Sequence, residues 1–178
     1  MDALIQRNAN INIQNHHKDT ALCCAAHHGH KSVVELLLAN DASVHYKNSD
    51  EETAFALGVR FERLECATML LEGGSDVDLP DVNGVTPLTR AAFGGRMSTL
   101  QYLFATAKPD VAAKNRNGET ALTVAVRNRQ SDICRLLISQ GVPVNSVDDS
   151  GRTALMWACM GKHNDMANIL LGEPTSHC

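Results

Sequence analysis

Small and apolar residues recur along the chain with a period of about 33 positions. Each period contains a Thr-Ala or Thr-Pro step followed by Leu or Phe, and successive threonines are separated by 33, 33, 34 and 33 residues. These threonines are Thr20, Thr53, Thr86, Thr120 and Thr153. A short run of small side chains follows each threonine, and then a second run carries apolar pairs four positions apart. Because residues four apart share a helical face, the pattern predicts two helices in every period.

The polar residues predict where each helix pair begins and ends. An asparagine or aspartate stands five positions before each threonine, and Gly84, Gly118 and Gly151 stand two positions before the last three. Asn and Asp bond their own backbone in turns, Gly permits positive φ, and Thr caps helix N-termini. Each period therefore predicts a turn, a threonine-capped helix and a second helix. The second helix is expected to stop at a residue suited to the left-handed region, namely Asp41, Gly74 or Gly141.

These residues resemble the ankyrin repeat, whose pattern is Asp-x-x-Gly-x-Thr-Pro-Leu-His-x-Ala-Ala-x-x-Gly-His followed later by Leu-Leu-x-x-Gly-Ala-Asp-Val-Asn. Close matches are Ala25-Ala26-His27-His28-Gly29-His30 and Asp76-Val77-Asp78. The resemblance implies an all-α solenoid of helix–loop–helix units joined by short β-hairpin-like turns. We expect a single domain over residues 1–178, with a partial repeat at 1–14 and further repeats at 15–47, 48–80, 81–114, 115–147 and 148–178.

The chain departs from the family pattern at several positions. Lys18 and Glu51 replace the turn glycine, so the first two turns are expected to be looser. Gly58 stands for an alanine, and a glycine inside a helix costs about 1 kcal/mol. The repeat at 48–80 is therefore expected to exchange its amide protons faster than its neighbours. Trp157 follows the position of the family's missing histidine and is expected to lie in the core, where an indole finds packing and a hydrogen-bond partner.

Charge is distributed unevenly along the chain, which has a formal net charge of −4. Residues 48–80 carry eight acidic and two basic residues, whereas residues 81–147 carry four acidic and eight basic ones. Two interpretations stay open, namely an ordinary solvated surface and a dipolar groove that orients a charged partner. The overall acidity argues against nucleic acid as the main ligand.

Composition also bounds the cellular setting. No stretch approaches the roughly 20 apolar residues of a membrane span, and the N-terminal residues lack the pattern of a signal peptide. The six cysteines show no disulfide spacing, which predicts reduced thiols in a cytoplasmic or nuclear protein. The half repeat at the start and the abrupt last helix favour a monomeric segment of a longer protein, the alternative being ends that a partner covers.

The resemblance implies that hairpin tips and first helices form a concave surface for a partner protein or peptide. Matching the positions gives eight candidate residues, Arg60, Phe61, Phe93, Arg116, Asn117, Arg127, Asn128 and Met160. Phe61, Phe93 and Met160 are interpreted as equivalent positions where the fold needs nothing apolar, and binding sites are rich in such residues. Arg116 and Arg127 are expected to pair with acidic groups. The alternative is that single exposed apolar residues are ordinary.

Candidates for chemistry are few. Cys23 and His27, like Cys24 and His28, are four apart and share a helical face, which zinc could use, but a second pair at the required spacing is missing. No phosphate-binding loop or nucleophile motif occurs. We therefore expect no enzyme, no cofactor and no metal site. A structural or self-association segment is the main alternative to partner binding, and a metal- or thiol-dependent enzyme is the weakest.

The resemblance further implies a modification. Ankyrin repeats are substrates for asparaginyl hydroxylation at the last residue of the Asp-Val-Asn step, and Asn12 and Asn145 occupy that position here. Asn145 lacks the usual preceding acidic residue. The alternative is that both are turn asparagines with a purely structural role.

Overall fold

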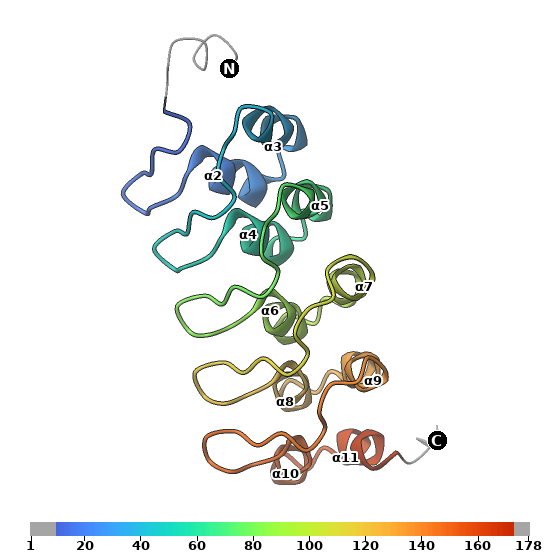
Figure 1. Ribbon diagram of the computed structural model, residues 1–178. Coiled ribbons are helices and arrows are strands. Elements are labelled where there is room, and N and C mark those ends of the chain that lie inside the picture. Colours follow the sequence, from blue (N-terminus) through green and yellow to red (C-terminus); the bar gives the residue numbers. More distant parts are fainter. Residues whose placement is uncertain (1–9, 173–178) are drawn as a thin grey trace. The chain divides into compact units, whose positions relative to one another are not determined.

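The computed structural model describes residues 10–172, and within that range it contains ten helices and no strand (Figure 1). The helices come in pairs, which confirms the expected all-α repeat fold. The pairs are α2 (Ala21–His28) with α3 (Lys31–Leu38), α4 (Ala54–Arg60) with α5 (Leu64–Glu72), α6 (Pro87–Phe93) with α7 (Met97–Thr106), α8 (Ala121–Arg127) with α9 (Ser131–Ser139), and α10 (Ala154–Met160) with α11 (Asn164–Leu171).

Each first helix begins directly after the threonine of its repeat. The threonine side-chain oxygen accepts a hydrogen bond from the backbone N–H three residues later in all five cases. Pro87 occupies the first turn of α6, where its missing N–H costs nothing. A cap of this kind stabilises a helix by about 1 kcal/mol. The predicted threonine caps are thus confirmed, and they fix where every first helix starts.

The turn before each first helix is held by a side chain. The Oδ1 atom accepts hydrogen bonds from the backbone N–H groups two and four residues later at Asn15, Asn48, Asn115 and Asp148. Lys18 and Glu51 adopt φ values of 58° and 60°, while Gly84 has 75°. Non-glycine residues therefore take up the same left-handed turn. The expected looseness of these turns concerns their motion and stays a prediction.

The chain divides into two compact units, Met1–Val82 and Asn83–Cys178. In the first unit α2 packs on α4 and α3 packs on α5. In the second unit α6 and α10 both pack on α8, and α11 packs on α9. The single domain and the repeat boundaries stay predictions, and most of the partial repeat at 1–14 lies outside the described residues.

Each unit has a core of small and aliphatic side chains. In the first helices the fully buried residues include Leu22, Ala26, Leu88 and Leu122, and in the second helices one face is buried through residues such as Leu100. Burying a leucine stabilises the fold by about 1.5–3 kcal/mol. The small residues let neighbouring helices approach closely. None of the described helices is both long enough and apolar enough to cross a membrane.

Within each unit, backbone hydrogen bonds join successive hairpin tips. In the first unit the N–H groups of Ser49 and Val82 donate to the carbonyl oxygens of His17 and Asp50, both at 2.8 Å. In the second unit those of Arg116 and Asp149 donate to Asn83 and Asn117, at 3.0 and 3.1 Å. In each unit the loops project from the first helices on the side away from the second helices (Figure 1). Side chains at neighbouring tips are thereby held side by side.

Candidate functional site

A groove of about 360 Å³ opens in the second unit beside α6, α8 and their hairpins. We call it the α6–α8 groove, and it is lined by Asn83, Val85, Thr89, Arg90, Phe93, Asn115, Arg116, Asn117, Glu119, Val124, Arg127 and Asn128. Five of the eight candidate residues line it, namely Phe93, Arg116, Asn117, Arg127 and Asn128. The fold thus gathers residues from two repeats around one hollow.

The other three candidates lie elsewhere. Arg60 and Phe61 line a hollow of about 350 Å³ in the first unit, together with His27 and Glu52. Met160 is 62% exposed at the end of α10 and lines neither hollow. The eight candidates therefore do not form one continuous site in either unit.

Phe61 differs from Phe93 and Met160 in register. Phe93 and Met160 are the last residues of α6 and α10, whereas Phe61 follows the last residue of α4. Phe61 is half-buried, and its ring stacks on His27 with centroids 4.0 Å apart and planes 9° from parallel. Phe61 was expected to be equivalent to Phe93 and Met160, and this is wrong. In the repeat of Phe61, the residue equivalent to Phe93 is Arg60. Phe61 also packs within the fold, unlike the exposed Phe93.

Two of the candidate arginines already hold a buried carboxylate. Arg127 Nη1 donates to Glu119 Oε1, and Arg60 Nη1 donates to Glu52 Oε2 at 2.7 Å. Glu119 and Glu52 are only 5% and 3% exposed. Asn115 Nδ2 donates to the second oxygen of Glu119 at 2.9 Å. Because a buried carboxylate needs a cation and donors, Arg127 and Arg60 have a structural role that their sequence positions alone did not indicate.

Arg116 and Phe93 are different, because their side chains are exposed in the groove. The Arg116 backbone N–H is fixed by Asn83, but among residues 10–172 its guanidinium has no hydrogen bond or ion pair. Phe93 is the last residue of α6, and its side chain is 61% exposed. Gln130 Nε2 donates to the Phe93 carbonyl oxygen at 3.2 Å. The groove therefore combines a free cation with an apolar ring on a fixed backbone.

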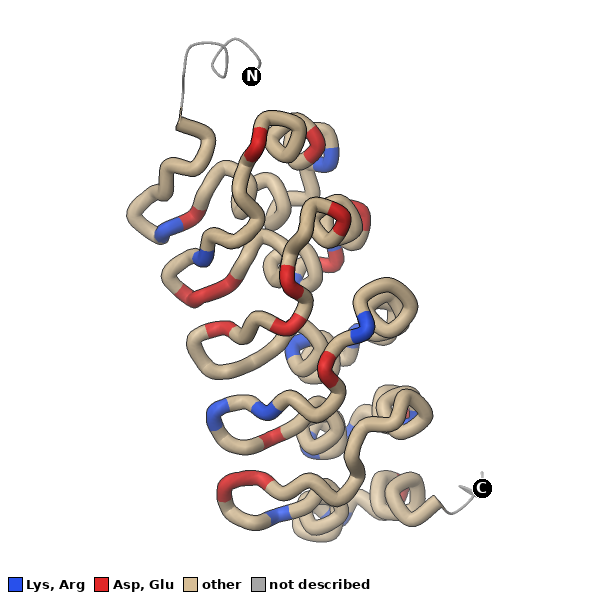
Figure 2. The backbone as a smooth tube through the Cα atoms, viewed as in Figure 1, with Lys and Arg blue, Asp and Glu red and all other residues tan. Residues whose placement is uncertain are grey.

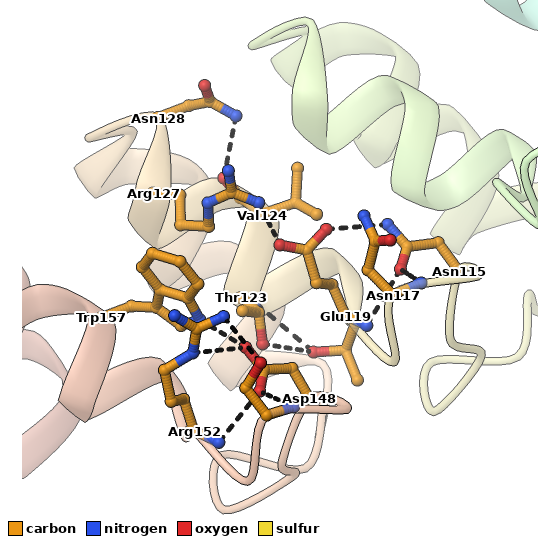
Figure 3. A network of polar contacts seen from close by, with 12 residues as sticks. Asn115, Asn117, Glu119, Thr123, Val124, Arg127, Asn128, Asp148, Arg152 and Trp157 are labelled. Atoms are coloured by element: carbon orange, nitrogen blue, oxygen red, sulfur yellow. Dashed lines mark hydrogen bonds and ion pairs between the residues drawn. The ribbon is translucent and has the colours of Figure 1, made fainter.

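Trp157 lies next to the groove residue Arg127, and the guanidinium groups of Arg127 and Arg152 both approach its ring (Figure 3). The Cζ atoms of Arg127 and Arg152 lie 4.7 and 4.0 Å from the ring centroid. The indole N–H donates to Asp148 Oδ2 at 2.9 Å. The side chain is half-buried, so the expectation of a core position is wrong. The reason is that cations rather than apolar side chains lie over the ring, and contacts of this kind contribute about 0.5–2 kcal/mol.

Asp148 is the acceptor at the centre of this cluster. Burial by itself would raise the pKa of its carboxyl. Hydrogen bonds from the Arg152 backbone N–H, the Trp157 indole and the Ser150 backbone N–H, together with the Arg152 charge, outweigh burial and lower the pKa from 3.8 to about 2. The carboxylate is therefore ionised throughout the physiological range, and it holds Trp157 and Arg152 in place.

The cysteines and histidines of α2 make contacts within the fold. Cys23 is buried and accepts a hydrogen bond from the Thr20 hydroxyl at 3.4 Å, whereas Cys24 is exposed. His27 and His28 stack with centroids 4.7 Å apart. Within residues 10–172, no group of three or more His, Cys, Asp or Glu side chains is placed to hold a metal ion. The expectation that the protein needs no metal or cofactor stays a prediction.

The two asparagines considered for hydroxylation lie in turns. Asn12 Oδ1 accepts a hydrogen bond from the Ser43 backbone N–H at 3.0 Å, which gives Asn12 a structural role. Asn145 is exposed. Hydroxylation of either residue stays a prediction.

Sequence reasoning missed Glu52 and Glu119, although a signal was present. Each glutamate directly precedes a capping threonine in a repeat whose first helix ends in arginine, as in Glu-Thr-Ala-Phe-Ala-Leu-Gly-Val-Arg and Glu-Thr-Ala-Leu-Thr-Val-Ala-Val-Arg. In the third repeat the same two positions hold Val85 and Phe93. The hairpin folds back beside the helix, so residues eight apart come together.

Comparison with known proteins gives a consistent result. The family model described as ankyrin repeats (3 copies) matches residues 1–81 and 88–178. Neurogenic locus notch homolog protein 1 of Homo sapiens is 33% identical over 141 residues, which is 79% of this chain and 6% of that protein. Neurogenic locus notch homolog protein 2 of Homo sapiens is 33% identical over 120 residues, which is 67% of this chain and 5% of that protein. The chain thus spans only about 6% of the length of the curated relatives it matches.

Among solved structures, the crystal structure of EF0377, an ankyrin repeat protein, has a similar fold. The TM-score is 0.87, with 97% of this chain and 90% of that chain covered. Sequence identity is 23%, so this likeness concerns the fold alone.

Proposed function

Because the chain belongs to the ankyrin-repeat family, we propose that it binds a partner protein or peptide over its hairpin tips and first helices, which form a concave surface in the family. Ankyrin repeats are a general protein-interaction module. The observation that carries the proposal is the α6–α8 groove, which gathers Phe93 and Arg116 with three other candidate residues. Exposed aromatic and arginine side chains are enriched where partners bind most strongly.

The proposal includes what the chain does not do. It catalyses no reaction and needs no cofactor, and what supports this is that the sequence contains no phosphate-binding loop and no nucleophile motif. Burial raises the pKa of Cys134 to about 12, so its thiol stays protonated and unreactive. The chain acts as a monomeric segment of a larger cytoplasmic or nuclear protein. Its partners are proteins rather than nucleic acids.

A capture experiment tests the proposed surface. The purified protein and a Phe93→Ala/Arg116→Glu variant are immobilised and exposed to lysate from cells of the source organism. The control is Arg129→Glu, which makes the same charge change on an exposed residue between α8 and α9, outside the groove. Circular dichroism and Trp157 fluorescence confirm that all three proteins are folded.

We expect a defined set of proteins to bind the parent and the control and to be lost from the double variant. Identical capture by all three proteins would place recognition outside the groove. Arg127 is left unchanged, because its removal strands the buried Glu119 and confounds binding with stability.

The second candidate function is self-association within a larger repeat protein. It is favoured by three exposed apolar side chains on the last helix pair, Met156, Met160 and Leu171, which are 50%, 62% and 63% exposed. Further repeats docked there would bury this surface. Light scattering at increasing protein concentration separates the two functions, because a constant monomer mass argues against association between copies.

A further inference from the structure

We infer that the α6–α8 groove takes an extended acidic peptide segment, with Arg116 pairing with a carboxylate and Phe93 packing against an apolar side chain beside it. The inference rests on the proposed function and names the chemistry of the partner. It concerns the second unit alone and does not involve the hollow around Phe61.

The charge of the groove is positive. Its charged lining residues are three arginines, Arg90, Arg116 and Arg127, and one acid, Glu119. Glu119 is neutralised internally, because Arg127 pairs with one of its carboxylate oxygens and Asn115 donates to the other. Figure 2 shows that the hairpin before α8, which carries Arg116, is basic, and Lys114 is the other basic residue on it. An acidic partner matches this charge, whereas a basic partner would meet unfavourable like charges.

Arg116 is the cation that a partner can reach. Arg127 is held by Glu119 and lies over the Trp157 ring, so we regard it as a positioning residue. Arg116 is exposed at the hairpin tip, and no residue in the described range pairs with its guanidinium. A guanidinium offers two parallel donors to one carboxylate, and such a bidentate pair is stronger than a neutral hydrogen bond.

The apolar part of the groove lies next to this cation. Phe93 is 61% exposed, and Val85 and Val124 also line the groove. The position of Phe93 is occupied by His27, Arg60 and Arg127 in three other repeats, so the fold itself does not require an aromatic ring there. Burying this ring against an apolar side chain supplies affinity that charge alone would not.

Nucleic acid fits the groove less well. Phosphate backbones bind through many cations, and their binding weakens steeply with salt. Only Arg116 is a demonstrably unpaired guanidinium among the candidate residues, and the chain has a formal net charge of −4. The exposed amide of Asn117 suits the alternating donors and acceptors of an extended peptide backbone, and Asn128 keeps its amide oxygen as an acceptor while its Nδ2 donates to the Val124 carbonyl oxygen.

The test is a selection from a random library of short phage-displayed peptides on the full 178-residue protein. The most enriched peptide is then synthesised with a fluorescent label, and its affinity is measured by anisotropy. A second peptide replaces every Asp and Glu by Asn and Gln. The proteins compared are the parent, Arg116→Glu, Phe93→Ala and the control Arg129→Glu.

We expect the selected peptides to be enriched in Asp and Glu beside an apolar residue. Arg116→Glu and Phe93→Ala are each expected to weaken binding by about tenfold or more, whereas Arg129→Glu changes it little. The neutral peptide should bind the parent more weakly than the acidic peptide does, because it offers no carboxylate to Arg116. The parent should bind a single-stranded oligonucleotide of the same length more weakly than the acidic peptide.

Four results overturn the inference. Selected peptides without acidic enrichment would do so, as would equal losses for Arg116→Glu and Arg129→Glu, or tighter binding of the oligonucleotide. A selection that enriches no peptide also counts against it. The proposed function survives each of these results if the lysate proteins are still lost from the Phe93→Ala/Arg116→Glu variant, so the two failures are distinguishable.

Discussion

In the first four threonine-capped helices, the residue just before the threonine and the residue seven positions after the threonine have complementary side chains, either an acid with a basic residue or histidine, or two apolar residues. The matched pairs, in chain order, are Asp19 with His27, Glu52 with Arg60, Val85 with Phe93, and Glu119 with Arg127. The structure explains the match for the two Glu–Arg pairs, whose charged atoms meet. The last repeat breaks the rule, because Arg152 pairs with Asp148 instead and Met160 is left exposed. The side chains at these two positions thus decide whether the surface of a repeat is apolar or carries charges that are paired within the repeat.

Asp148 supplies a prediction about pH. Its pKa is about 2 in the folded protein against an ordinary value of 3.8, so the carboxylate stabilises the fold above pH 3.8. That contribution is lost as the pH falls through the folded pKa, since the unfolded state then binds the proton more readily. We expect Asp148→Asn to lower the urea midpoint at neutral pH. The gap from the parent should shrink as the pH is lowered from about 3.8 to about 2.

Asp149→Asn is the control, because it removes a carboxylate from the adjacent exposed residue. The difference in urea midpoint between the parent and Asp149→Asn should not shrink in the same way as the pH is lowered. A gap for Asp148→Asn that stays constant over this pH range would contradict the assigned role of the carboxylate.

Helices and turns impose opposite demands on glycine. Gly58 lies inside α4, and a Cβ there would meet the Ala67 Cβ at 3.5 Å, which is ordinary contact. Gly118 lies in a hairpin with φ of 72°, and a Cβ there would lie 2.7 Å from the Asp149 backbone nitrogen. The first glycine is therefore replaceable and the second is not.

We expect Gly58→Ala to stabilise the protein by about 1 kcal/mol, because alanine removes the entropic cost of glycine in a helix. The matched substitution Gly118→Ala should destabilise it by at least about 1–2 kcal/mol, since an L-residue is strained at that φ and the backbone must shift. Urea denaturation followed by circular dichroism measures both. A destabilised Gly58→Ala would show that α4 and α5 cannot accommodate the methyl group.

The elements could be predicted from sequence because their signals are local. Threonine caps, turn asparagines and apolar pairs all act within a few residues, and the structure confirms them. The site was predicted less completely. Trp157 is placed by Arg127 from the preceding repeat, and no local pattern indicates that contact. Arg127 in turn is tied to Glu119 through the return of the hairpin, which becomes predictable only once the repeat is aligned.

At the scale of the whole molecule, the charges of repeat 48–80 are not gathered on one element. Figure 2 shows its acidic residues on the hairpin, around α5 and on the connection that follows. This spread is typical of a solvated surface. The basic residues of the second unit include three that line one groove, so local charge there is concentrated by the fold. Of the dipolar groove considered from the sequence, only the basic part is gathered at one place, in the α6–α8 groove of the second unit. This is where we propose that the partner binds.

The two compact units supply a prediction about cooperativity. The chain has one tryptophan, Trp157, so its fluorescence reports on the second unit, whereas circular dichroism reports on both. Phe55 is fully buried in α4 of the first unit, and Phe55→Ala should cost about 3–5 kcal/mol there. Because each unit holds its own core, we expect the urea transition seen by circular dichroism to broaden towards lower urea. The Trp157 transition should keep its midpoint.

Leu122→Ala in α8 is the matched control, because Leu122 is also fully buried but lies in the second unit. It should lower the Trp157 midpoint, with a cost of about 2–5 kcal/mol. Stacked repeats are coupled through their nearest-neighbour interfaces, so strong coupling would make the whole chain unfold as one block. In that case Phe55→Ala would displace the fluorescence and circular dichroism transitions equally. Equal displacement would refute independent unfolding of the units and favour the single domain expected from the repeat pattern.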